Sequence, residues 1–515
     1  MIRKKIMKLK LIFILICLLF NTFLFSQTRR VSPNVGRINP ETSGGEHILS
    51  YDFINNLKYK FYNDSPNWPG LIGMIPLNNW SRNINDNSIN IWRTPLDKNY
   101  PTRSFVDYVE NSIARAESVV YISTLWFTPG NSMEEALKRA ISYLNQKSYQ
   151  KQQPIRVRII FSMFNASPIP TKNATQKVID YLIPDEISPY LDLSVICYRN
   201  PIAFNHSKII AVDSNQLITG GMNFPDKDYD DLENPVNDLS IEFNLPYIAD
   251  LGRIYLSKLA LETKIGDEFS INSIACTNTE KINCNVSDRW YELSNPAFNI
   301  FNINSILQSY NTDYILGAGK MMNAKEYGDA EVSTDSIISL MDSARYEINI
   351  SQQSIRNIAP ASTDIQHATC AALGRALMKG VKVNIILSSY SGQGVPFLGY
   401  AESSLSDSST EKCIIRNAKD FYNLDVRGAL GNLNILRVAR WFNYTGYKYG
   451  TAKNHVKLIM VDDQMAYIGS ENLYYNNHSE FGVIINSRLL MMKLKREYWT
   501  PTYGKSYSNY QSDSN

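Results

Sequence analysis

The stretch NHVKLIMVDDQMAYIGSEN, residues 454–472, is the most informative part of this chain. Its apolar run is typical of a buried β-strand, but His455 and Lys457 stand at the start of that run. Residues two apart in a strand point to the same face of the sheet. We therefore expect these two side chains to project together from a strand end, where they indicate a site with a chemical task.

A second copy of the stretch, NHSKIIAVDSNQLITGGMN, covers residues 205–223 and places His206 and Lys208 at the same offset. Both copies follow the pattern H-x-K-x4-D-x6-G-[GS]-x-N. The chain has five histidines, and two of them begin this pattern. A chance double occurrence of so specific a pattern is improbable, so the repeat indicates a duplicated functional unit.

The segments around the two motifs also repeat. ARAESVVYIS (114–123) resembles DSARYEINIS (342–351), and PIRVRIIFS (154–162) resembles GVKVNIILS (380–388). In each copy a helical stretch separates the two strand-like segments. The order strand, helix, strand predicts two α/β units built on βαβ crossovers. Polar, irregular sequence between about 265 and 330 is expected to contain the join.

The N-terminus has the composition of a secretory signal peptide. Five basic residues precede an apolar run from Leu11, and Ser26-Gln27 is a suitable cleavage point. The run is shorter than a membrane span of roughly 20 residues, although a retained anchor helix is the alternative. Cleavage would change the formal net charge from +3 to −2 by removing those five positive charges. A mature chain that is not basic overall argues against a protein that binds nucleic acid through its overall positive charge.

Cysteine usage fits an exported protein. Cys276 and Cys284 are close enough in sequence to form a disulfide that closes a local loop. Three further cysteines follow residue 26, namely Cys197, Cys370 and Cys413, so one of the five is left over. Their spacing does not match a metal site.

The residue types of the motifs fit an anion with several oxygen atoms, and phosphate is the first candidate. One histidine can attack phosphorus, while the other protonates the departing oxygen and later deprotonates water. This division of roles needs no metal or other cofactor, and we expect none. The candidate catalytic residues are His206, Lys208, Asp213, His455, Lys457 and Asp462, with Asn223 and Asn472 in support.

The two motif aspartates differ from the other candidates. Asp213 and Asp462 follow their histidines at an odd offset, after an apolar run and inside the turns VDSN and VDDQ. They cannot simply share the strand face of the histidine and lysine. We therefore expect them to orient or stabilise the motif more than to react.

The motifs and their surroundings resemble the phospholipase D superfamily, most closely its secreted bacterial members of the actinomycete type. The resemblance runs from about residue 90 to about residue 500. It is carried by NHSKIIAVDSNQLITGGMNFPDKDYDDLENPVNDLS, INISQQSI, GVKVNIILSS and VKLIMVDDQMAYIGSENLYYNNHSEFGVII. It implies two similar α/β domains, each a mixed sheet flanked by helices, packed pseudo-symmetrically with one active site at their interface. The expected ranges are a signal peptide at 1–26 and domains at 27–290 and 315–510.

The resemblance also implies a role for each motif residue. His206 would form a phosphohistidine, and His455 would be the general acid and then the general base. An acidic residue behind each histidine would fix its tautomer. Asp238 matches this position for the first histidine, and Glu480 matches it for the second, where the relatives carry aspartate. The phosphoryl oxygens would be held by Lys208, Lys457, Asn223 and Asn472.

Residues around the substrate are less closely matched. Phe224 and Pro225 stand where the actinomycete enzymes place a tryptophan, while Tyr229 is kept. Tyr400, in the Gly-rich loop 390–400, is expected to line the site. Aromatic residues before the second motif form either a lip for lipid or ordinary packing; they are Trp441, Phe442, Tyr444, Tyr447 and Tyr449. The remaining histidines, His47, His367 and His478, are expected to be solvated or structural.

The sequence therefore favours an exported phospholipase D, extracellular or in the periplasm or another lumen. It would cleave the distal phosphodiester of a glycerophospholipid at a membrane or micelle surface, with water or an alcohol as second substrate. We expect a monomer and no nucleic-acid partner. The alternatives are a nuclease of the same superfamily and a non-enzymatic binding protein built on the same fold. Intact motifs in both halves argue against the last.

Overall fold

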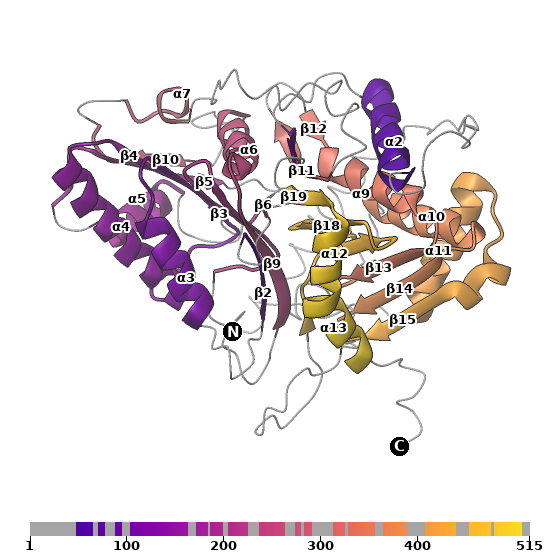
Figure 1. The fold of residues 1–515 in the computed structure, drawn as a ribbon. Coiled ribbons are helices and arrows are strands. Elements are labelled where there is room, and N and C mark those ends of the chain that lie inside the picture. Colours follow the sequence, from indigo (N-terminus) through magenta and orange to yellow (C-terminus); the bar gives the residue numbers. More distant parts are fainter. Residues whose placement is uncertain are drawn as a thin grey trace, which may run out of the picture.

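The computed structural model of the chain describes sixteen stretches, and two mixed β-sheets meet at its centre (Figure 1). The described residues are 48–64, 71–77, 88–94, 103–162, 171–183, 186–198, 204–224, 236–262, 273–279, 283–290, 313–324, 328–355, 364–388, 407–438, 453–474 and 478–506. Within them, one sheet has nine strands and the other has ten. The two-sheet α/β architecture predicted from the repeat is confirmed.

The first sheet has the strand order β10-β5-β4-β3-β7-β8-β9-β16, and β2 pairs with β9. Its strands are β2 (Ile89–Thr94), β3 (Val119–Thr124), β4 (Ile155–Ser162), β5 (Leu191–Tyr198), β7 (Ile209–Val212), β8 (Gln216–Gly220), β9 (Val236–Asn244), β10 (Ser273–Cys276) and β16 (Lys453–Asn454).

The second sheet has the order β1-β11-β19-β18-β17-β13-β14-β15, with β12 on β11 and β6 on β19. Its strands are β1 (Ile72–Pro76), β6 (Phe204–Asn205), β11 (Tyr314–Ala324), β12 (Gly328–Ala330), β13 (Glu347–Ser351), β14 (Lys382–Leu387), β15 (Leu433–Arg437), β17 (Leu458–Val461), β18 (Met465–Gly469) and β19 (His478–Asn486).

Helices flank both sheets (Figure 1). In the first half they are α3 (Arg103–Ala114), α4 (Ser132–Lys151), α5 (Thr171–Leu182), α6 (Ile248–Glu262) and α7 (Val286–Arg289). The others are α2 (Ile48–Asp64), α9 (Val332–Ser343), α10 (Asp364–Met378), α11 (Asp407–Tyr422), the 3-10 helix η2 (Arg427–Asn432), α12 (Arg488–Leu494), the π-helix η3 (Lys495–Trp499) and α13 (Thr500–Lys505).

The internal repeat corresponds to equivalent strands. β3 pairs in parallel with β4, and β13 pairs in parallel with β14, with a helix between the strands of each pair. The motif strands β7 and β17 then run antiparallel to β3 and β13. Both motifs therefore lie on central strands of equivalent sheets, beside the point where the sheet direction changes.

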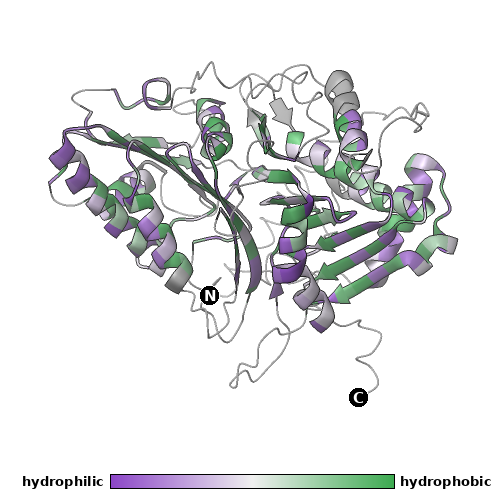
Figure 2. Ribbon diagram, viewed as in Figure 1, coloured by the Kyte–Doolittle hydropathy of each residue, from purple (hydrophilic) through white to green (hydrophobic). Residues whose placement is uncertain are grey.

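The two halves share a core. One continuous cluster of buried apolar side chains includes Ile209 of the first sheet, Leu251 of α6 and Ile315 of the second sheet. A separate cluster lies between the first sheet and helices α3 to α5. Figure 2 shows apolar residues concentrated on the strands and on the sheet-facing sides of the helices. Burial of apolar area across α6 stabilises the docking of one half on the other.

Three strands join the sheet of the opposite half. β1, from the N-terminal part of the chain, pairs with β11 at the edge of the second sheet. The two-residue strands β6 and β16, just before each motif histidine, pair with β19 and β9 respectively. The predicted range 27–290 therefore includes strands of both sheets, and the domain bounds remain a prediction.

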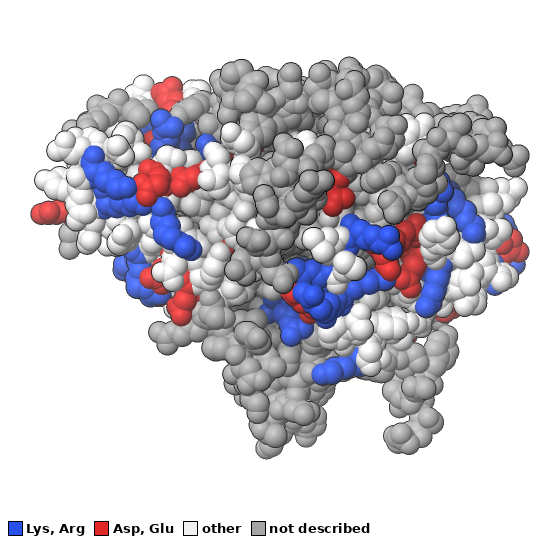
Figure 3. All heavy atoms as spheres, viewed as in Figure 1, with Lys and Arg blue, Asp and Glu red and all other residues white. Residues whose placement is uncertain are grey.

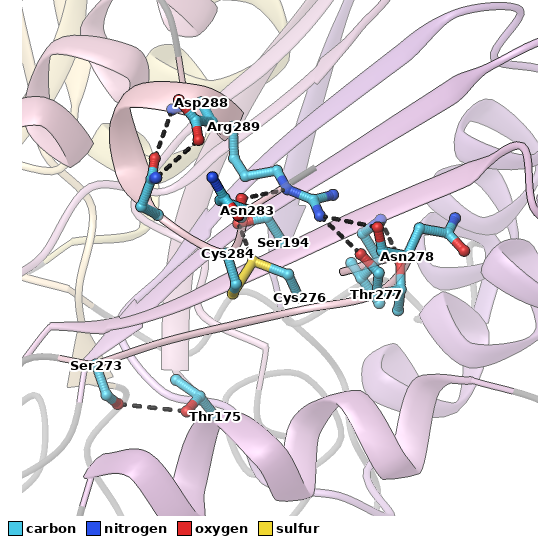
Figure 4. The surroundings of a disulfide bond; sticks show 12 residues. Thr175, Ser194, Ser273, Cys276, Thr277, Asn278, Asn283, Cys284, Asp288 and Arg289 are labelled. Atoms are coloured by element: carbon cyan, nitrogen blue, oxygen red, sulfur yellow. Dashed lines mark hydrogen bonds between the residues drawn. A yellow bond between two sulfur atoms is a disulfide. The ribbon is translucent and has the colours of Figure 1, made fainter. Parts of the chain in front are cut away.

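Two disulfides are present among the described residues. Cys276 pairs with Cys284, as the sequence indicates, and Cys370 pairs with Cys413, while Cys197 is a buried free thiol. Around the first disulfide, Arg289 donates hydrogen bonds to the carbonyl of Thr277 and to other backbone oxygens (Figure 4). None of the helices in the described part of the chain is long and apolar enough to cross a membrane. The predicted signal peptide lies outside the described residues.

Candidate active site

Each motif histidine is held by the backbone of the opposite half. The amide of His206 donates to the carbonyl of Ser479 at 2.8 Å, and the amide of His455 donates to the carbonyl of Asn237 at 2.7 Å. These bonds continue the short parallel pairings of β6 with β19 and of β16 with β9. The two imidazole rings lie at the junction of the sheets, with centroids 6.4 Å apart. One phosphoryl group between them can be reached by both rings.

The asparagine before each histidine fixes the motif backbone. Asn205 accepts hydrogen bonds from Ser207, and its amide nitrogen donates to the hydroxyl of Ser123 at 2.8 Å. In the second half, the amide nitrogen of Asn454 likewise donates to the hydroxyl of Ser351 at 3.0 Å. Sequence reasoning missed this role. The signal was present, because the repeated segments 114–123 and 342–351 both end in serine.

The carboxylates behind the histidines are crossed between the halves, which corrects the predicted pairing. Nδ1 of His206 lies 3.0 Å from each carboxylate oxygen of Glu480, in the second half. Nδ1 of His455 lies 2.7 Å from Oδ2 of Asp238, in the first half. The crossing follows from β6 and β16, which place each histidine beside the other half's long strand. The site is complete only when the halves are docked.

These contacts set the tautomer of the proposed nucleophile. Nδ1 of His206 faces the Glu480 carboxylate and the carbonyl of Ser470, both of which accept hydrogen bonds from it. Nδ1 must therefore carry the proton, which leaves the lone pair on Nε2. Burial, followed by the charges of Lys208 and Lys457, lowers the pKa of His206 well below its ordinary value. The ring is thus neutral at pH 7, as a nucleophile requires.

His455 also resides in an environment that disfavours its charged form. Burial and the ammonium of Lys457 lower the pKa of His455 to about 4, against the opposing effect of Asp238. An anion placed between the two lysines would offset their charge and raise this pKa. The arrangement therefore couples protonation of His455 to binding of a negatively charged group.

The extra methylene of Glu480 is accommodated by a change at a neighbouring residue. In the first half, a Cβ on Gly221 would lie 2.0 Å from Oδ1 of Asp238, so only glycine fits beside that carboxylate. In the second half the equivalent residue is Ser470, and its hydroxyl donates to the Glu480 carboxylate. The pairs Gly221–Asp238 and Ser470–Glu480 are alternative ways to fill the same space.

The lysines and asparagines of the motifs are buried at the same junction. Nζ of Lys208 and Nζ of Lys457 each donate to the carbonyl of their own motif histidine. Asn223 and Asn472 are buried directly after β8 and β18, the strands beside the motif strands. The structure therefore brings the two histidines and two lysines into one region, as the effects of both lysines on His206 show. The role of the two asparagines in holding phosphoryl oxygens stays a prediction.

The motif aspartates lie away from the histidines. Asp213 begins the turn after β7 and accepts hydrogen bonds from the backbone amides of residues 117–119, at 2.9 to 3.1 Å. Asp462 does the same after β17 for residues 345–347, at 2.8 Å. Both have positive φ values, 49° and 51°. The two aspartates therefore do not belong with the reacting residues among which they were predicted. Their contacts support the expected structural role.

His478 lies beside the motif histidines, although the sequence predicts only that it is solvated or structural. It begins β19, two residues before Glu480 and on the same face of the strand. Its ring centroid lies 5.4 Å from that of His206 and 5.2 Å from that of Phe204. Burial and the neighbouring His206 lower the pKa of His478 to about 3. Its equivalent in the first half is Val236, so the repeat itself gave no signal for it.

The predicted substrate-lip residues Tyr229 and Tyr400, and the aromatic residues between 441 and 449, lie outside the described residues, as does His47. His367, on α10, contacts Asn417 of α11 and belongs to the helical layer. In the described part of the chain, no three His, Cys, Asp or Glu side chains are grouped as metal ligands would be.

Two sheets joined by crossed histidine–carboxylate pairs, with two buried lysines, define a two-domain phosphoryl-transfer site. Known proteins agree with this class. The family described as "Cardiolipin synthase, PLD-like domain" matches residues 337–500. A phospholipase D of Streptomyces antibioticus is 26% identical over 446 residues, which are 78% of this chain and 77% of that protein. The chain belongs to the phospholipase D-like superfamily.

The overall fold has a counterpart among solved structures. The phosphatidylserine synthase of Haemophilus influenzae Rd KW20 superposes with a TM-score of 0.53, covering 88% of this chain and 91% of that one. At 12% identity, this likeness shows a shared fold. It supports the two-domain arrangement of the sheets.

Proposed function

We propose that the protein is an exported phospholipase D. It would hydrolyse the distal phosphodiester of glycerophospholipids to phosphatidic acid and a free head-group alcohol. The observation that carries the proposal is the crossed pair of neutral, oriented histidines between two buried lysines. The similarity to the Streptomyces phospholipase D over most of both chains supports a lipid substrate.

The first step forms a covalent intermediate. His455 takes up a proton on Nε2 from solvent when the anionic phosphodiester binds beside it. Nε2 of His206 attacks phosphorus, the bond from phosphorus to the head-group oxygen breaks, and His455 gives that proton to the departing oxygen. The product is phosphatidyl-histidine and a free alcohol. Lys208 and Lys457 stabilise the charge on the phosphoryl oxygens, and Asn223 and Asn472 donate hydrogen bonds to them.

The second step releases the lipid. Neutral His455 removes a proton from water, the water oxygen attacks phosphorus, and the bond from phosphorus to His206 breaks. Phosphatidic acid leaves, and both histidines return to their starting state. A primary alcohol can take the place of water, in which case a new phosphatidyl ester forms.

Charge also favours a lipid over a nucleic acid. On the face drawn in Figure 3, lysine and arginine side chains lie beside acidic ones. The whole chain carries a formal charge of only +3, and cleavage of the proposed signal peptide would lower it further. The two disulfides support an oxidising compartment and hence export.

The test compares residues 27–515 with the variant His206→Ala on two substrates. Phosphatidylcholine vesicles with added ethanol are assayed for choline and phosphatidylethanol, and single-stranded DNA is assayed for cleavage. We expect lipid products from the wild type alone. Cleavage of DNA with inert lipid would overturn the proposal in favour of a nuclease, and lipid products that persist in His206→Ala would overturn the mechanism.

A further inference from the structure

A buried ion pair lies behind one of the two histidines and has no equivalent behind the other. Nζ of Lys320, on β11, lies 3.4 Å from Oε1 of Glu471, which follows β18. Both side chains are almost completely buried, at 1% and 0% exposure. The hydroxyl of Thr334 on α9 also donates to Glu471. Burying two charges is costly, so such a pair adds little stability over an apolar pair of the same volume.

The pair is placed beside the carboxylate that holds His206. Lys320 is the direct cross-strand partner of Glu480 in the β11–β19 ladder. Glu471 follows Ser470, whose hydroxyl donates to that same carboxylate. The chain of contacts therefore runs from the ion pair to Glu480 and from Glu480 to Nδ1 of His206.

The first half carries neutral residues at the same two positions. There the cross-strand partner of Asp238 is Thr94, which accepts from the Asp238 amide at 3.1 Å. The residue equivalent to Glu471 is Met222. Since both halves share the same scaffold, the comparison isolates the ion pair as a feature of the His206 side alone.

We propose that Lys320 and Glu471 form a positioning unit for His206: Lys320 keeps the Glu480 carboxylate ionised, and Glu471 holds the Lys320 ammonium in place and limits its effect, so that His206 keeps its proton on Nδ1 and its lone pair on Nε2. This inference rests on the proposed role of His206 as nucleophile. If Glu480 takes up a proton, it can donate to Nδ1, and the proton of the ring then moves to Nε2. His206 would lose its nucleophilic nitrogen.

The charges around Glu480 determine the direction of this effect. Burial raises the pKa of Glu480, while the positive charges of His478 in its protonated form, Lys208 and Lys320 lower it. Burial raises the pKa of Glu471, Lys320 opposes that shift, and the Glu480 carboxylate adds to it, so the two carboxylates disfavour each other's ionised form. The titratable and charged groups that face Glu480 are His206, Lys208, Tyr255, Lys320, Tyr467, Glu471, Tyr474 and His478.

The test uses substitutions with opposite electrostatic signs. Lys320→Met removes the cation and should raise the pKa of Glu480. The acid limb of the pH–rate profile for phosphoenzyme formation should therefore move to higher pH, by on the order of one unit. Glu471→Gln removes the anion and should move the limb to lower pH. The double variant should lie between them, and it also guards against misfolding, because it leaves no unpaired charge of the pair. The rate of phosphoenzyme formation is measured with an activated aryl phosphodiester in single-turnover experiments.

A matched control separates the effect of Lys320 on Glu480 from a general loss of protein stability. Arg437→Met removes another buried cation of the second half, paired with Asp407, and should lower the melting temperature while leaving the acid limb in place. Shifts of the limb in the same direction for Lys320→Met and Glu471→Gln would overturn the proposal. So would equal losses of rate without any shift.

A second readout needs no substrate. With nitrogen-15 in the five histidine rings, the spectrum reports which nitrogen of His206 is protonated, and His206→Ala identifies its signals. Lys320→Met should move the change from the Nδ1–H to the Nε2–H form to higher pH. If the wild type fails to cleave lipid, the proposed function fails, and this titration still decides the inference. An unchanged tautomer in Lys320→Met would overturn it.

Discussion

Glu480 and His206 come from opposite halves of the chain, yet Nδ1 of the imidazole lies 3.0 Å from both carboxylate oxygens. The reciprocal contact joins Asp238 to His455 at 2.7 Å. Each half therefore supplies one histidine and the carboxylate for the other histidine. This relationship makes the roles of the two acids separable by experiment.

The first prediction concerns the crossed pairing. Glu480→Ala should slow phosphoenzyme formation about 100-fold or more even with an activated leaving group, because it disorders the nucleophile. Asp238→Ala should slow it far less with that substrate, since an activated leaving group needs no proton from His455. Burst kinetics measure both. The opposite ranking would support the pairing within each half that the sequence suggested.

The second prediction concerns the space beside each carboxylate. Gly221→Ser should abolish turnover, because the added Cβ would collide with the Asp238 carboxylate. Combining it with Asp238→Glu recreates the Ser470–Glu480 arrangement of the other half and should restore part of the activity. Steady-state rates for the single and double variants decide this. A double variant no better than Gly221→Ser would show that the two arrangements are not interchangeable.

The third prediction separates the motif aspartates from catalysis. Asp462→Ala removes the acceptor for three backbone amides and should lower the free energy of unfolding by about 2 kcal/mol. Turnover per folded molecule should stay within a few-fold of the wild type below the melting transition. Urea unfolding and active-site titration provide the two numbers. A loss of turnover as large as that of His455→Ala, in a folded protein, would contradict the structural role.

The fourth prediction concerns acid stability. His455 and His478 have pKa values near 4 and 3 in the folded chain, below their ordinary value, so the unfolded state binds protons first as pH falls. The contribution of these two histidines to stability is therefore complete above pH 6.5 and should be lost progressively as pH falls toward about 4 for His455 and about 3 for His478. His478→Val, the residue of the other half, should reduce the slope near pH 5 by up to about 1.4 kcal/mol per pH unit. Urea unfolding at several pH values measures the slope, and an unchanged slope would contradict the depressed pKa.

The fifth prediction concerns metals. Both steps of the proposed reaction use only side chains of this chain, so EDTA should leave the rate of lipid hydrolysis unchanged. The assay is run on protein dialysed against chelator, with and without added divalent cations. Strong inhibition that a metal reverses would contradict the histidine-only mechanism.

Much of this structure could be predicted from the sequence because the chain contains two copies of the same unit. The repeat located β3, β4, β13 and β14 and both motif strands, since strand alternation and chain order are local properties. The crossed carboxylates could not be predicted, because two residues of pairing in β6 and β16 determine them. Such short strands leave no periodic signal. The resemblance to relatives suggested the correct acids, and only the spatial arrangement showed which histidine each one holds.

Lys320 and His478 escaped prediction for a different reason. Each lies outside the motif, and each replaces a neutral residue of the other half, Thr94 and Val236. A search for shared features passes over positions where the copies differ. Differences between aligned strands are informative only once the register of the sheets is known.

The exchange of β6 and β16 between the sheets means that activity cannot precede assembly. A nascent or cleaved fragment holding one motif has a histidine but lacks the acid that orients it. Two inert fragments, divided in the stretch 291–312, should regain function when mixed, by complementation. With the proposed phospholipase activity, the chain would thus stay inactive in the cell that makes it until its last strand has been added.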